Sequence, residues 1–144
     1  REQDLTPLIG LEEDGLEEVT ILLSQLHEYG IVIADNVFAN VSSNGRKLLL
    51  YDFNLMPNPD HSAAALQAND LRGLCLSAVG MGGLEVDYVV DVVMQVYQPS
   101  DGVKKELVMG RENGYLREKL YLKPIFEVTR EQANEVEQLI IDNL

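Results

Sequence analysis

The sequence predicts a mainly helical α+β domain with one small β-hairpin near its N-terminal end. Several long segments repeat apolar residues at helical spacing, and one short segment carries Asn44-Gly45, a dipeptide typical of tight hairpin turns. The chain has 144 residues, of which 46% are hydrophobic, and this suits one domain with a buried core. Residues 1–144 are therefore expected to form a single domain.

The first helix is expected over residues 15–29. Glu17 and Glu18 lie on its polar face, and Gly30 is expected to end it because glycine readily adopts the left-handed conformation of a helix end. The apolar face consists of Leu16, Val19, Leu22, Leu23 and Leu26.

Two short apolar runs follow, at residues 31–33 and 47–51, and both are expected to be β-strands. Between them, Val41 and the dipeptide Asn44-Gly45 favour a tight hairpin turn, because Asn and Gly both tolerate positive φ. The expected order is therefore helix, short strand, loop and hairpin.

The remaining chain is expected to be helical. Prolines at residues 57 and 59 mark a loop, after which residues 62–79 and 86–97 predict two helices joined through the glycines of residues 80–83. Valines in the second segment favour a strand by propensity, but its length and its lack of alternation favour a helix.

Two further helices are expected near the C-terminus. Residues 99–102 predict a turn, and residues 103–123 predict a helix interrupted by Gly110 and Gly114. Thr129 and Gln132 have the spacing of a capping box, which predicts the start of a last helix. Its apolar face consists of Ala133, Val136 and Ile140.

Composition and charge narrow the choice of partners. With 24 acidic and 11 basic residues, the net charge of −13 disfavours nucleic acid and anionic membranes, and it favours basic proteins or metal ions. No apolar run reaches the roughly 18 residues of a membrane span. The single cysteine, Cys75, lies in an apolar stretch, so it is expected to be a buried thiol of a protein in a reducing, cytoplasmic compartment.

Three oxygen-bearing side chains surround the predicted hairpin. Asp35 and Asn40 would lie at the two ends of one loop, and Asp52 follows the second strand of the hairpin, so their oxygens could converge. Phosphoryl transfer needs such a set, because it requires a carboxylate beside the acceptor hydroxyl and metal ions that neutralise the phosphates. Magnesium prefers hard oxygen ligands of this kind.

The segment from Leu26-His27 to Asp35 and Asn40, followed by residues 51–54 (Tyr-Asp-Phe-Asn), resembles the catalytic and metal-binding loops of the protein-kinase-like superfamily. The resemblance implies the C-terminal lobe of that fold, with the hairpin at the active site. It also implies that Asp35 is the catalytic base, and that Asn40 and Asp52 bind Mg²⁺ (or Mn²⁺) and the phosphates of ATP, the co-substrate.

Four more residues enter the resemblance in supporting roles. Asp70 resembles the aspartate that, from the start of a buried central helix, bonds backbone amides of the catalytic loop; the local alternative is a plain helix N-cap. Ile33 is expected to pack against Phe53. His27 belongs to a Leu-His pair that is structural in kinases, and this role is favoured over that of a catalytic base.

The chain also departs from the typical kinase pattern. Ala34 stands where the arginine of His-Arg-Asp is common, so a receptor for an activation-loop phosphate is not expected. Val37 replaces a lysine near the transferred phosphate, and Asn54 replaces the glycine of Asp-Phe-Gly. Too few residues separate Asp52 from Asp70 for a long activation segment. Compact bacterial effector kinases and aminoglycoside-type small-molecule phosphotransferases are similarly economical.

These observations predict an ATP-dependent phosphotransferase, with a protein hydroxyl favoured over a small molecule as the acceptor. One alternative is a pseudokinase that serves as a protein-binding module, and another is a small-molecule kinase. The glycine-rich loop and strand lysine of an N-terminal lobe are not found in this sequence, so the chain is expected to be one lobe of a longer protein. The expected location is the cytoplasm, or a host-cell cytoplasm if the protein is a secreted effector.

Overall fold

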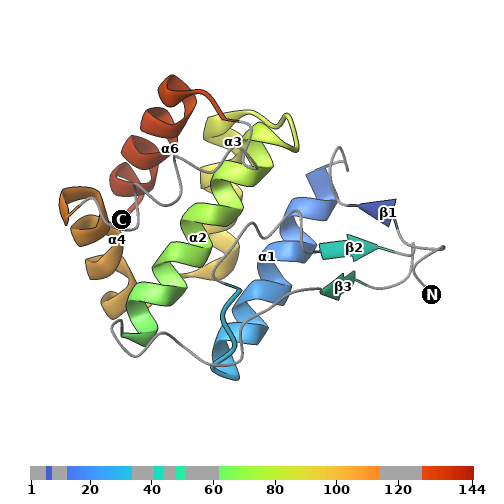
Figure 1. Ribbon diagram of the computed structural model, residues 1–144, viewed down its shortest axis with the longest axis horizontal. Coiled ribbons are helices and arrows are strands. Elements are labelled where there is room, and N and C mark those ends of the chain that lie inside the picture. Colours follow the sequence, from blue (N-terminus) through green and yellow to red (C-terminus); the bar gives the residue numbers. More distant parts are fainter. Residues whose placement is uncertain (1–5, 8–12, 34–40, 44–47, 51–61, 114–127) are drawn as a thin grey trace.

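Helix α2 (Ala63–Gly80) forms the centre of the fold, and the other helices pack around it (Figure 1). Every residue from 68 to 79 is buried, so this helix meets protein on all sides. The computed structural model describes residues 6–7, 13–33, 41–43, 48–50, 62–113 and 128–144. Within these residues the chain is mainly helical, as expected from the sequence.

The other described elements are β1 (Thr6–Pro7), α1 (Glu13–Glu28), β2 (Val41–Ser43), β3 (Leu48–Leu50), α3 (Val86–Tyr97), α4 (Asp101–Asn113) and α6 (Arg130–Asp142). Helix α1 and the small sheet lie on one side of α2, and α4 and α6 lie on the other (Figure 1). Helix α3 contacts α1, α2 and α6, so it joins the two sides.

The sheet has three antiparallel strands in the order β1-β2-β3. Val41 lies opposite Leu50 and Ser43 lies opposite Leu48 in the β2–β3 pair. The connecting residues, which include Asn44-Gly45, lie outside the described residues. Strand β1, in which Thr6 pairs with Ser43, was not predicted from the sequence.

The prediction of a strand at residues 31–33 was wrong. Only Val32 forms an isolated bridge there, and the backbone amide of Ile33 is bonded to a side chain of α2 instead of a neighbouring strand. Gly30 adopts φ +75° and its amide bonds the carbonyl of His27 at 3.0 Å, which ends α1 as expected.

The predicted helices over residues 62–79 and 86–97 correspond to α2 and α3. The side chain of Ser62 accepts a hydrogen bond from the amide of Ala65 and caps α2. Consequently the expectation that Asp70 stands at the start of a helix was wrong, as was the alternative of an N-cap, because Asp70 lies in the middle of α2.

The C-terminal helices differ in how closely they follow the prediction. Helix α4 begins at Asp101 and runs through Gly110 to Asn113, so the expected interruption at Gly110 is absent; Gly114 lies outside the described residues. The capping box of α6 is confirmed, because Thr129 and Gln132 each bond the other's backbone amide.

One apolar core joins α1, α2, α3, α4 and α6. Its fully buried side chains include Leu23 of α1, Leu74 of α2, Val93 of α3, Leu107 of α4 and Ile140 of α6. None of the helices that the structure describes is both long and apolar enough to cross a membrane.

Candidate functional site

The predicted site residues divide between described and undescribed parts of the chain. Asp35, Asn40, Asp52 and Phe53 lie outside the described residues. Ile33 and Asp70 are described, and both are buried, with exposures of 1% and 0%. The structure therefore gives the surroundings of the segment that leads into Asp35.

Asp70 joins two parts of the N-terminal half of the chain. Its Oδ2 atom accepts a hydrogen bond of 2.8 Å from the backbone amide of Ile33, two residues before Asp35. The same oxygen lies 2.8 Å from Nε2 of His27, at the C-terminal end of α1. One buried carboxylate of the central helix thus holds both the end of α1 and the segment that follows it.

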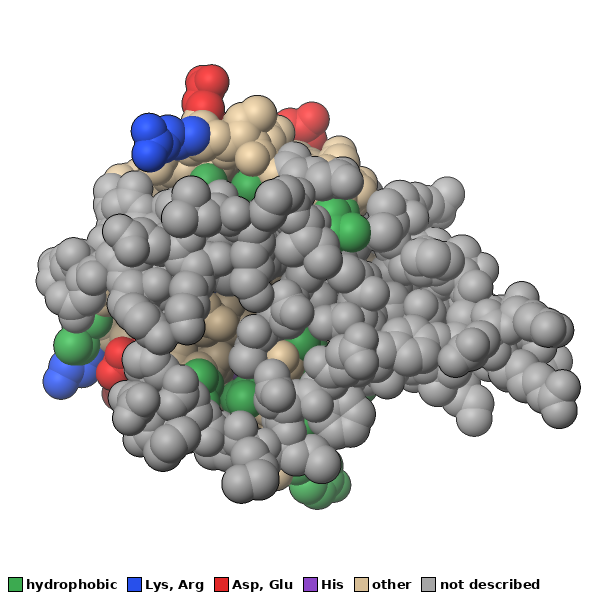
Figure 2. Space-filling model, in the orientation of Figure 1, with side chains coloured by type: hydrophobic (Ala, Val, Ile, Leu, Met, Phe, Trp, Pro, Cys, Tyr) green, Lys and Arg blue, Asp and Glu red, His purple; other side chains and the backbone are tan. Residues whose placement is uncertain are grey.

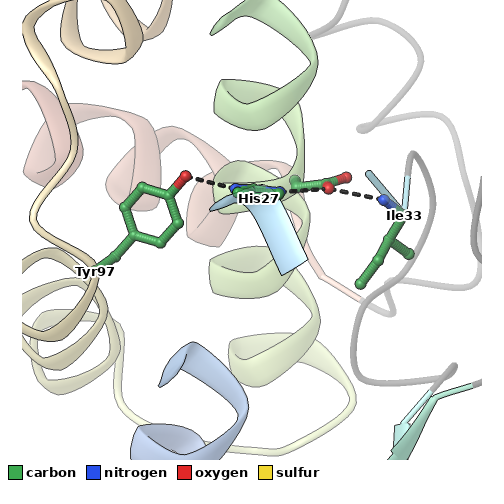
Figure 3. A network of polar contacts seen from close by, with 4 residues as sticks. His27, Ile33 and Tyr97 are labelled. Atoms are coloured by element: carbon green, nitrogen blue, oxygen red, sulfur yellow. Dashed lines mark hydrogen bonds and ion pairs between the residues drawn. The ribbon is translucent and has the colours of Figure 1, made fainter. Parts of the chain in front are cut away.

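His27 lies between Asp70 and Tyr97 of α3, with which its two ring nitrogens make contact. Figure 3 shows these contacts running from Tyr97 through His27 toward Ile33. Its Nδ1 atom is 2.5 Å from the hydroxyl of Tyr97, and the two rings meet edge to face with centroids 5.4 Å apart. An ionised Asp70 only accepts hydrogen bonds, so Nε2 carries the proton. In the neutral imidazole, Nδ1 then accepts from the Tyr97 hydroxyl.

The electrostatics of this chain of contacts favour the protonated hydroxyl. Burial raises the pKa of Tyr97 well above its usual value, and the nearby charge of Asp70 raises it further. Tyr97 therefore keeps its hydroxyl proton throughout the physiological pH range and can donate it to His27 while the imidazole is neutral. The order of donation runs from Tyr97 to His27 and from His27 to Asp70.

This arrangement gives His27 a positioning role. Both of its ring nitrogens are engaged by protein, and the residue is 6% exposed, so it has no free nitrogen with which to act as a base. Asp70 was expected to accept a hydrogen bond from a backbone amide of the segment that leads to Asp35, and the amide of Ile33 donates such a bond. Together, His27 and Asp70 hold the backbone at Ile33 in place.

A second buried polar cluster lies deeper, between α2 and α6. Nε of Arg72 donates to Oε1 of Glu137 at 2.8 Å, and Nη2 of Arg72 donates to the carbonyl of Leu107 in α4. Nη1 of Arg72 and Oε2 of Glu137 have no hydrogen-bond partner among the described residues. The pair joins three helices around the core and is a structural feature of the domain.

Cys75 lies near this ion pair and is fully buried, as expected from its apolar surroundings. Burial raises the pKa of its thiol to about 12; the Glu137 carboxylate also raises it, and Arg72 opposes them. Cys75 is therefore an unreactive core thiol, in contrast to the exposed, low-pKa cysteines that serve as nucleophiles.

Among the described residues, no group of three or more His, Cys, Asp or Glu side chains could hold a metal ion. The predicted ligands Asn40 and Asp52 lie outside that part of the chain, so the magnesium site stays a prediction.

Sequence reasoning missed two of the polar contacts. Tyr97 was assigned only to the end of a helix, although its partner His27 lies 70 positions earlier. The Arg72–Glu137 pair was also missed, although Arg72 interrupts an apolar segment and Glu137 lies on the apolar face of α6. A charged residue within an apolar helix face was the available signal, because such residues are buried only with a partner.

On the face shown in Figure 2, the described charged side chains are few and of both signs. They form no patch of a single sign on the described part of that face.

Compared with known proteins, the chain matches no protein-family model, no curated protein and no solved structure.

Proposed function

We propose that this chain supplies the catalytic and metal-binding loops of an ATP-dependent phosphotransferase with the C-terminal lobe of a protein-kinase-like fold. Asp35 orients the acceptor hydroxyl and accepts its proton. Asn40 and Asp52 hold the magnesium ions that neutralise the phosphates of ATP. The preferred acceptor is a protein hydroxyl.

The observation that supports this proposal is the double contact of Asp70. Phosphoryl transfer depends on positioning and electrostatic stabilisation, so its catalytic loop needs a rigid attachment to the core. The Oδ2 atom of Asp70, in the most buried helix, holds the amide of Ile33 and the imidazole of His27 at 2.8 Å. Asp35 follows Ile33 by two residues.

The burial of Asp70 also favours a role in positioning the backbone before Asp35 over a role for that segment as an ordinary solvent-exposed turn. A carboxylate without exposure is costly unless it is hydrogen-bonded or paired with a charge. Apolar side chains would fill the centre of α2 without that requirement. The presence of Asp70 there is explained if the backbone before Asp35 must be held in one conformation.

The test is a transfer assay with radiolabelled ATP, together with calorimetric titration of magnesium-ATP, on the natural protein in which this segment occurs. We expect Asp35→Asn to lower transfer by about 100- to 10,000-fold, the usual effect of a general base, with ATP binding retained. Asp52→Ala should abolish magnesium-dependent ATP binding. Asp91→Asn, an exposed aspartate of α3, serves as the matched control and should change neither property.

Two outcomes would redirect the proposal. Transfer that Asp35→Asn leaves unchanged would remove the catalytic role of this residue. A wild-type protein that binds a protein partner but neither binds ATP nor transfers phosphate would identify a pseudokinase module, which the replacement of the usual lysine by Val37 favours. If transfer to small hydroxyl compounds exceeds transfer to proteins, the small-molecule kinase is favoured instead.

A further inference from the structure

A cavity of about 290 Å³ opens between α1, α2, α3 and the start of α4. It lies at the Tyr97 end of the Tyr97–His27–Asp70 contacts, and both Tyr97 and His27 contribute to its wall. The other polar residues of the wall are Ser24, Glu28, Gln67, Gln98 and Ser100.

The charge of the wall determines which ligands it suits. Among the described residues that line the cavity, Glu28 is the only carboxylate and there is no Lys or Arg. The net charge of the chain is −13, so the potential around the cavity repels anions and attracts cations. Phosphorylated metabolites and nucleotides are therefore poor ligands for this cavity, whereas an ammonium group is a good one.

The neutral polar groups of the wall add hydrogen-bonding capacity. Ser24 offers a hydroxyl, and Gln67 and Gln98 each offer an amide that donates and accepts. A ligand with hydroxyl groups uses such partners fully, whereas a purely aliphatic one leaves them unpaired. The volume is near the lower end of the range for small-molecule pockets, so the ligand is a small one.

The backbone of Gln98 gives an independent indication that this wall is used. Among the described residues, Gln98 is the only non-glycine residue with positive φ, at 54°. It follows the last residue of α3, a position where glycine or asparagine is the usual choice because other residues are strained. Glutamine at a strained position is explained if its side chain is needed in the cavity.

We propose that this cavity is a binding site for a small organic ammonium compound that also carries hydroxyl groups. The carboxylate of Glu28 pairs with the ammonium group, and the side chains of Ser24, Gln67 and Gln98 bond the hydroxyls. The hydroxyl of Tyr97 is already bonded to His27, so Tyr97 contributes its ring to the wall. The site is independent of the proposed phosphotransfer.

The test compares two probes that differ in one group. Serinol (2-amino-1,3-propanediol) carries an ammonium group where glycerol carries a hydroxyl. Each is titrated into ¹⁵N-labelled protein while the side-chain amide signals of Gln67 and Gln98 are followed by NMR. We expect saturable shifts with serinol at millimolar concentration, and binding about tenfold weaker with glycerol, as expected for a hydrogen bond to a charged group.

Three variants separate binding in the cavity from attraction by the overall negative charge of the protein. Glu28→Gln should remove the preference for serinol, whereas Glu131→Gln, which removes the same charge from an exposed position on α6, should retain it. Gln98→Gly should weaken serinol binding and raise the melting temperature, because glycine relieves the left-handed backbone. This last variant remains informative because it is expected to be more stable than the wild type.

The proposal is overturned if glycerol binds as tightly as serinol or if neither probe gives saturable shifts. It is also overturned if Glu131→Gln weakens serinol binding as much as Glu28→Gln does, because the attraction would then be a property of the whole charge. Serinol binding that survives both Glu28→Gln and Gln98→Gly unchanged would place the ligand elsewhere.

Discussion

His27 and Asp70 form a buried pair in which Nε2 and Oδ2 are 2.8 Å apart, with side-chain exposures of 3% and 0%. The pair connects the last turn of α1 to the middle of α2, and the same carboxylate oxygen accepts a hydrogen bond from the backbone amide of Ile33. Neither residue could be moved without loss of the other's partner. The contact therefore fixes where the chain leaves α1 on its way to Asp35.

Replacing Asp70 by asparagine should lower the free energy of unfolding by about 3 kcal/mol, since two hydrogen bonds to a buried charge are weakened together. Urea denaturation at neutral pH measures the change. Asp91→Asn is the matched control: its carboxylate bonds Gln95 on the exposed face of α3, and the substitution should change stability by less than about 0.5 kcal/mol. Equal effects of the two substitutions would contradict a special role for Asp70.

Replacing Tyr97 by phenylalanine should lower stability by about 1 kcal/mol near neutral pH, because Nδ1 of His27 loses its donor. It should also change the response to alkali. The pKa of Tyr97 is higher in the folded protein than the usual 10.0, so folding favours the protonated hydroxyl. That contribution is present in full below about pH 10 and is lost progressively as the pH rises above it.

The measurement is a series of urea unfolding curves from pH 8 to the alkaline limit of folding. Above about pH 10, the wild type should lose stability faster than Tyr97→Phe. Tyr29→Phe is the control, because Tyr29 is 83% exposed and should leave the pH dependence unchanged. Parallel curves for the wild type and Tyr97→Phe would show that the Tyr97 hydroxyl titrates alike in both states.

Local sequence patterns were sufficient to predict most of the helices. The Thr129–Gln132 capping box and the apolar face of α6 lie within one or two turns of chain, so their physics is readable from neighbouring residues. The valine-rich α3 was the harder case, and there length decided correctly against strand propensity. Gly110 did not interrupt α4, because a single glycine weakens a helix by only about 1 kcal/mol.

Contacts between distant parts of the chain were predicted less well. The strand expected at residues 31–33 has the right β-branched composition, but its Ile33 amide is taken by Asp70. Asp70 was recognised as a residue that bonds backbone, but it was expected at a helix start, although the helix predicted over residues 62–79 already has residue 70 near its middle. Tyr97 approaches His27 only because α3 packs on α1, and no local pattern encodes that packing.

Cys75 should resist thiol reagents in the folded protein. Its thiol is fully buried and its pKa is raised to about 12. A reagent therefore cannot reach the sulfur, and the reactive thiolate form is scarce. We expect its reaction with a disulfide reagent at pH 8 to be at least about 1000-fold slower than in urea, because only opened molecules react. No other cysteine is present, so the signal reports this residue alone. A rapid reaction without urea would contradict its burial.

Removing one partner of the Arg72–Glu137 pair should lower the free energy of unfolding strongly, whereas removing both partners should lower it only slightly. Glu137→Leu leaves the guanidinium of Arg72 buried without its carboxylate, and we expect it to lower the free energy of unfolding by about 3–5 kcal/mol. Arg72→Met combined with Glu137→Leu replaces both charges by apolar side chains of similar size. This double variant should recover most of the lost stability, because the desolvation penalty of both ions disappears with their attraction.

A double-mutant cycle of urea unfolding measures the coupling between the two residues. We expect the double variant to recover part of the stability that Glu137→Leu loses. Nη1 of Arg72 and Oε2 of Glu137 lack partners among the described residues, so the pair stabilises the fold less than a fully hydrogen-bonded pair would. If the double variant is as unstable as Glu137→Leu alone, the stabilising contact of Arg72 is its bond to the carbonyl of Leu107 instead. Restored stability would show that α2 and α6 are held together by packing of the core, with the ion pair setting only their alignment.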